Sequence, residues 1–241
     1  MRGAARTGKG GCGIRKIAKI LLVFLIVAAI AIGAVLYRQW ENVKTIYEAK
    51  TNSTETIIRK AEESKEQQRA VLEENGISVV PPSLDQIESL IDGKTTADEL
   101  KEELGVAEAA PEQAASAAPL TEEQREAKAQ ERTEGCVKEL YAYEADLMES
   151  LSALKQEALD AYHALPREEQ TRRGRLKVGY SFLDRCYELE AESDARVQEI
   201  LDKLRDDLEA LGRDTSIADT LWQHYCDEKS TAKEYYFSKY L

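Results

Sequence analysis

Apolar residues recur at alternating steps of three and four through the second half of the chain. They do so from Cys136 to Leu165, from Tyr180 to Leu211 and from Ile217 to Tyr240. This spacing places the apolar side chains on one face of an α-helix. Because short polar connections favour antiparallel neighbours, residues 121–241 are predicted to form a three-helix bundle that resembles a coiled coil.

Polar residues mark the start and the interruptions of this bundle. Thr121 and Gln124 have the spacing of a capping box, which predicts the start of the first helix. The charged segment Arg167–Lys177 contains a glycine and is predicted to be a loop. Glu190 and Asp194 occupy apolar positions of the second helix, so we expect looser packing there.

Residues 38–75 are predicted to form one helix that precedes the bundle. Its apolar positions follow a weak heptad pattern that Lys65 interrupts. Asn75-Gly76 is a typical helix stop, because glycine accepts the left-handed backbone conformation at low cost. Weak patterns of this kind favour loose self-association or packing against another part of the chain.

A short helical hairpin and a linker join this helix to the bundle. Within residues 76–105, capping-box spacings begin at Ser83 and at Thr96 and predict two short helices. A hairpin this small is expected to dock on another element, because its own core is too small to stabilise it. Residues 106–120 are rich in alanine and proline and are predicted to be a linker.

The longest apolar run lies near the N-terminus. Ile20–Tyr37 contains no charged residue, and a membrane-spanning helix needs roughly 20 apolar residues. Tyr37 and Trp40 follow the run, where aromatic rings favour the membrane interface. The expected fold is therefore all-α, with a transmembrane helix at residues 20–37 after a basic tail at residues 1–19.

The charge distribution predicts the orientation of this helix. Six of the 33 basic residues precede residue 38 and none of the 45 acidic residues does, so residues 38–241 carry a formal charge of −18. The positive-inside rule then puts the N-terminus in the cytoplasm and the C-terminal part outside the cell membrane. An acidic outer part argues against nucleic acid as a partner.

A cleaved signal peptide is the alternative interpretation of the N-terminus. Ala29–Ala31 and Ala31–Gly33 resemble small-residue cleavage sites. The uncharged run is longer than the usual signal-peptide core, and Arg38 follows it directly, which favours the anchor. Cleavage would instead release a secreted helical protein.

Three of the four cysteines lie beyond the predicted membrane helix. Cys136, Cys186 and Cys226 are an odd number, so a single bridge would leave one thiol over. Reflecting Cys136 through the two predicted turns brings it opposite Cys226. This pair is the candidate disulfide, and burial of all three as small apolar side chains is the alternative.

The sequence holds no catalytic, cofactor-binding or metal-binding motif that we recognise, so no enzyme activity, cofactor or metal is expected. The aromatic C-terminus is the most suggestive surface, because tyrosine is favoured at protein interfaces. Packing of the last helical turns is the other interpretation of the same residues, and the pattern favours it. This candidate interaction patch consists of Tyr235, Tyr236, Phe237 and Tyr240.

The function expected from these patterns is that of a single-pass envelope protein of bacterial type. Its extracytoplasmic helices would act as a non-enzymatic scaffold or bind a protein partner, including a second copy. A ligand-sensing helical bundle is the second hypothesis, and a secreted helical protein is the third. Helical architecture by itself does not distinguish them.

Overall fold

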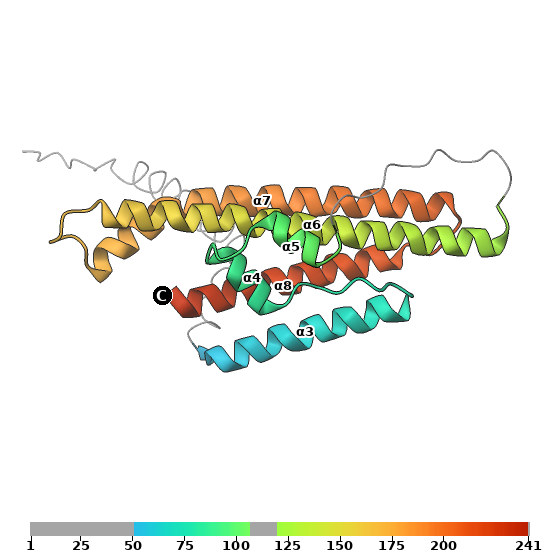
Figure 1. Cartoon of the computed structure of the whole chain (residues 1–241), viewed down its shortest axis with the longest axis horizontal. Coiled ribbons are helices and arrows are strands. Elements are labelled where there is room, and N and C mark those ends of the chain that lie inside the picture. Colours follow the sequence, from blue (N-terminus) through green and yellow to red (C-terminus); the bar gives the residue numbers. More distant parts are fainter. Residues whose placement is uncertain (1–50, 107–119, 241) are drawn as a thin grey trace, which may run out of the picture. The chain divides into compact units, whose positions relative to one another are not determined.

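The computed structural model describes residues 51–106 and 120–240, and every regular element in these ranges is a helix. The predicted all-α class is therefore confirmed for this part of the chain. Two compact units are described separately: residues 55–232, and residues 51–54 with 233–240. The helices are α3 (Thr54–Glu74), α4 (Leu84–Ile91), α5 (Ala97–Glu103), α6 (Glu122–His163), α7 (Arg172–Ala210) and α8 (Ser216–Tyr240) (Figure 1).

The predicted transmembrane helix at residues 20–37 lies outside the described residues, as does most of the linker at residues 106–120. Within the ranges that the structure does describe, no helix combines the length and the apolar character that crossing a membrane requires.

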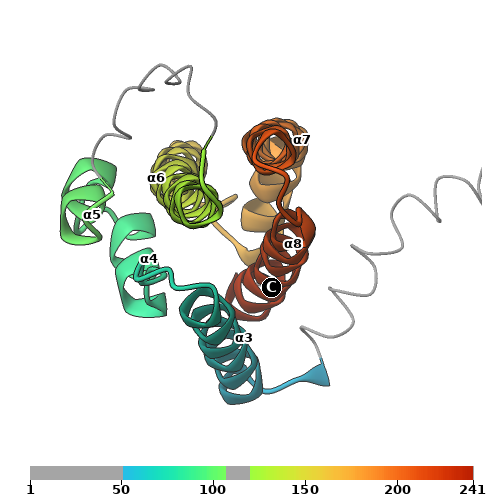
Figure 2. The same ribbon diagram turned by 90° about the vertical axis from the view of Figure 1, so that its right-hand side faces the viewer.

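Helices α6 and α7 form a long antiparallel pair. Arg196 Nη2 lies 2.8 Å from Glu139 Oε1, and Arg185 forms a bidentate ion pair with Glu157. Residues later in α6 therefore pair with residues earlier in α7, as the antiparallel direction requires. Figure 2 looks along this pair and shows α8 beside α7, with α4 and α5 on the far side of α6.

The turn between α6 and α7 is shorter than the charged sequence suggests. The prediction of a loop from Arg167 to Lys177 is wrong at its second half, because α7 begins at Arg172. Thr171 caps this helix, its hydroxyl accepting a hydrogen bond from the Gly174 N–H at 3.2 Å. Exposed charged residues are compatible with a first helical turn, so their charge did not mark the boundary.

The short hairpin of α4 and α5 docks on α6. The predicted capping boxes at Ser83 and Thr96 are both present. Ala145 of α6 packs with apolar residues of the hairpin, and Lys155 Nζ lies 2.7 Å from Asp92 Oδ1. Close ion pairing with Lys155 and Lys94 lowers the pKa of Asp92 to about 2.

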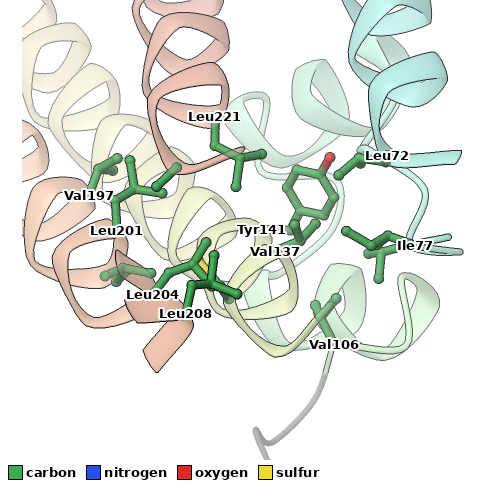
Figure 3. Packing of buried hydrophobic residues seen from close by; sticks show 14 residues of the cluster. Leu72, Ile77, Val106, Val137, Tyr141, Val197, Leu201, Leu204, Leu208 and Leu221 are labelled. Atoms are coloured by element: carbon green, nitrogen blue, oxygen red, sulfur yellow. The ribbon is translucent and has the colours of Figure 1, made fainter. Parts of the chain in front are cut away.

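The main core joins α6 to helices on two sides. The stripe predicted from Cys136 faces α7, where Val197, Leu201, Leu204 and Leu208 are buried. A second α6 face, not predicted, buries Val137 and Tyr141, and Figure 3 shows Tyr141 pointing toward Leu72 of α3. Burying one large aliphatic side chain completely stabilises the folded chain by roughly 1.5–3 kcal/mol, so this core makes the main stabilising contribution.

Helix α8 returns along α7. Gly212, in the left-handed conformation, ends the preceding helix, and Asp214 Oδ1 accepts a hydrogen bond from the Ser216 N–H at 3.0 Å. Arg205 of α7 contacts Asp219 of α8 at 2.8 Å. Helix α8 thus begins at Ser216, one residue before the third apolar stripe predicted from Ile217.

The helix predicted over residues 38–75 is interrupted in its described part. Asn52 and Ser53 are not helical, and α3 starts at Thr54. Asparagine and serine side chains compete with the helix for backbone hydrogen bonds, which favours a break at this position. The predicted stop at Gly76 is confirmed, since its φ is +72°.

Candidate functional site

An exposed apolar face lies on the first half of α7. Tyr180 is 70% exposed, Tyr187 is 42% exposed, and Leu176 is also exposed. The sequence pattern assigns Tyr180 and Tyr187 to the interior of the bundle, and this prediction is wrong. The heptad pattern identifies a face of the helix but does not say whether another helix covers it.

The exposed face continues the line of positions that forms the core further along α7. Leu183 and Tyr187 follow Leu176 and Tyr180 at steps of three and four, and the same steps lead on to Val197 and Leu201. Arg185 lies on the opposite side of α7 from this line and pairs with Glu157 of α6. We call Leu176, Tyr180, Leu183 and Tyr187 the α7 face.

Charges of opposite sign flank the two ends of the α7 face. Residues 172–177 contain three arginines and one lysine and no acidic residue. Residues 184–192 contain Asp184, Glu188, Glu190 and Glu192 but only one arginine. A partner that covers this face would therefore meet a basic end and an acidic end.

A second group of polar side chains lies between α3, α6 and α8. Lys65 Nζ lies 3.8 Å from Glu228 Oε1 and donates a hydrogen bond to the Pro82 carbonyl oxygen. The hydroxyl of Tyr141 and the Oε1 of Gln68 are enclosed and form no hydrogen bond, and these two residues are about 95% buried. We call Lys65, Gln68, Tyr141, Glu144 and Glu228 the buried polar cluster.

Burial governs the protonation of the two carboxyls in this cluster. It raises the pKa of Glu144 to about 7, and the neighbouring charge of Glu228 acts in the same direction. Burial also raises the pKa of Glu228, while the ammonium of Lys65 opposes both shifts. The hydroxyl of Tyr141 likewise has a raised pKa because of burial. The cluster therefore holds a proton near neutral pH.

The sequence contained one signal of this cluster. Lys65 interrupts the weak heptad pattern of α3, and a charged residue at an apolar position needs a partner of opposite charge. Glu144 and Glu228 could not be chosen as its partners, because the chain has 45 acidic residues and most carboxylates lie at helix-surface spacing.

A third polar group links α7 to α8. Asp194 Oδ1 accepts hydrogen bonds from Tyr225 at 2.7 Å and from Lys229 at 2.6 Å. Glu190 lies 3.5 Å from Lys229, and Ser193 contacts the Tyr225 hydroxyl at 2.9 Å. Glu190 and Asp194, which interrupt the second apolar stripe, thus pair with Lys229 of α8, and these contacts hold the two helices in register.

A hollow of about 470 Å³ lies beside residues 78–83 and α6. Arg69, Glu103, Glu134 and Lys138 contribute charges of both signs to its wall. Lys138 Nζ pairs with Glu134 at 2.7 Å, so much of this charge is already neutralised. Among the residues that the structure describes, no group of three side chains is arranged to bind a metal ion.

The three described cysteines are free thiols. Burial raises the pKa of Cys136 to about 12, and its charged neighbours on α7 include Lys203 and Asp207. Cys226 instead has Asp194 as its charged neighbour on α7. Asp194 lies more than two helical turns before Lys203 and Asp207. The structure thus does not form the predicted Cys136–Cys226 bridge, because the packed register differs from simple reflection through the turns.

The aromatic patch at the C-terminus belongs to the smaller unit. Tyr235 and Tyr236 are half-buried, and their ring centroids lie 5.2 Å apart in an edge-to-face arrangement. The side chains of Phe237 and Tyr240 lie outside the described part of the structure. The role predicted for these four residues in binding a partner stays a prediction.

Comparison of the chain with models of protein families, with curated proteins and with solved structures gave no match.

Proposed function

We propose that this chain is a membrane-anchored, non-enzymatic interaction module of the cell envelope. Residues 20–37 would anchor it, with residues 1–19 in the cytoplasm and the helical part on the outer side. The six basic residues before residue 38 and the acidic remainder support this orientation.

The exposed α7 face is the observation that carries the proposal. It presents two tyrosines and a leucine to solvent along a regular helical line. Tyrosine combines a large apolar ring with a polar hydroxyl, which is why it is enriched at protein interfaces. A helix with an uncovered heptad face is suited to binding another helix in the same way that it packs in its own bundle.

The polar groups of the interior support a structural role for the helices. Lys65 joins α3 to α8, and Asp194 joins α7 to α8. These contacts fix helices in register, so that the long α6–α7 pair can present the α7 face as a rigid surface. A preformed surface lowers the entropic cost of binding.

Site-specific photo-cross-linking in intact cells tests this proposal. A photoreactive phenylalanine derivative at Tyr180 should form an adduct with a protein. The control is the same derivative at Gln198, which is exposed on α7 about 27 Å further along the helix axis. Equal adduct yields at the two positions, or none at either, would contradict the proposal.

A further inference from the structure

We infer that the partner of the α7 face is a second copy of this chain, packed antiparallel to the first. This inference rests on the proposed function and adds the identity and the direction of the partner. It is carried by the distribution of charge along the face and by the spacing of its four apolar residues.

The apolar spacing fixes how two such faces can interlock. In an antiparallel pair of helices, residues of one helix at the two heptad core positions face the opposite core positions of the other. When two copies of α7 are aligned antiparallel about a midpoint between residues 181 and 182, Tyr180 of each copy faces Leu183 of the other. The same alignment brings Leu176 opposite Tyr187, so all four residues of the α7 face are covered.

The charges favour this direction over a parallel one. With the same midpoint, Lys177 of one copy lies beside Asp184 of the other, and Arg173 lies near the acidic stretch that includes Glu188 and Glu192. All five side chains are exposed in the described chain. A parallel pair would instead align residues 172–177 with themselves, so that like charges repel.

The chain offers cysteine positions that distinguish the two directions. In the antiparallel pair, Gly179 lies beside Cys186 of the second copy, and a side chain added at Gly179 meets no atom within 4 Å. The two Cys186 residues lie nine positions apart along the axis, about 13 Å, which is too far for a disulfide. Tyr187 faces its own counterpart only in a parallel pair.

The test uses full-length chain in native membranes, with Cys12, Cys136 and Cys226 replaced by serine or alanine. After mild oxidation, Gly179→Cys should give at least about tenfold more disulfide-linked dimer than the chain that keeps Cys186 alone. Tyr180→Asp should remove most of this dimer, because it places a charge in the apolar contact. Gln198→Asp, the matched control, should leave the dimer unchanged.

The parallel reporter is Tyr187→Cys in a chain with Cys186→Ser. A dimer from this variant, without one from Gly179→Cys, would overturn the antiparallel arrangement. Absence of dimer from both, together with a photo-cross-linked adduct of a different protein at Tyr180, would overturn the second copy as partner and leave the proposed function standing. Absence of both the dimers and the adduct would overturn the two proposals together.

Discussion

Lys65 of α3 and Glu228 of α8 lie far apart in the sequence, yet the Nζ of the first lies 3.8 Å from the Oε1 of the second. Lys65 is also the ammonium group that opposes the raised pKa values of Glu144 and Glu228. Two carboxyls and one ammonium cannot balance in charge, so the buried polar cluster needs one proton to become neutral. This requirement links the packing of α3, α6 and α8 to pH.

The first prediction concerns the pH dependence of folding. The pKa of Glu144 is raised from 4.5 to about 7 on folding, so the folded chain holds a proton that the unfolded chain has lost. Its stabilising contribution is full below about pH 4.5 and is lost as the pH rises through about 7. Glu144→Gln should therefore flatten the fall in unfolding free energy between pH 5 and pH 8, measured by chemical denaturation.

The control for this prediction is Glu131→Gln, which changes an exposed carboxyl on the same helix. Its profile should follow that of the unchanged chain. At pH 8 the Glu144→Gln chain should be more stable by on the order of 1–3 kcal/mol. A Glu144→Gln profile as steep as that of the control would show that Glu144 is not the group that takes up the proton.

The second prediction concerns the ion pair. Lys65→Met should lower the unfolding free energy at pH 7.5 by about 2–4 kcal/mol, because it leaves two partly buried carboxyls without a counter-charge. The loss should be smaller at pH 5, where Glu144 is protonated. Adding Glu228→Gln should restore part of the stability, since the double variant removes a carboxyl as well. Additive losses in this double-mutant cycle would mean that the two side chains do not interact.

The third prediction concerns the turn before α7. A Cβ added at Gly174 would lie 2.0 Å from the carbonyl oxygen of Glu169, so Gly174→Ala requires the backbone to move. We expect a loss of at least about 2 kcal/mol in unfolding free energy or a visible rearrangement of the turn. Gly179→Ala meets no atom within 4 Å and should instead be neutral or stabilising by up to about 1 kcal/mol. Equal effects of the two substitutions would refute this account of the turn.

Hydrophobic spacing predicted the helices of the described chain better than it predicted their contacts. Thr121 and Thr96 mark helix starts because a capping box is a local hydrogen-bond pattern that the sequence contains entirely. The second buried face of α6, at Val137 and Tyr141, depends on α3 and the hairpin packing against it, which no local pattern encodes. Tyr180 illustrates the opposite case, because its spacing is that of a core residue although no described helix covers it.

The buried polar cluster was beyond prediction for a related reason. Lys65 could be recognised as an interruption of an apolar pattern, but its partners come from α6 and α8 and are set by the register of three helices. The prediction of a disulfide between Cys136 and Cys226 was wrong for the same reason, because it depended on the register of packed helices. A difference of a few residues in register moves two side chains on neighbouring helices several ångströms apart.

The central claim is that a membrane anchor holds these helices outside the cytoplasm, and cysteine accessibility tests it most directly. Two full-length chains would be compared in intact cells with a membrane-impermeant thiol reagent, one retaining only Cys12 and one only Cys186, which is exposed. We predict full-size protein labelled at Cys186 in intact cells, and labelling of Cys12 only after the membrane is permeabilised. Labelling of Cys12 but not Cys186 in intact cells would contradict the claim, and a shortened chain in the medium would replace the anchored module with a secreted one.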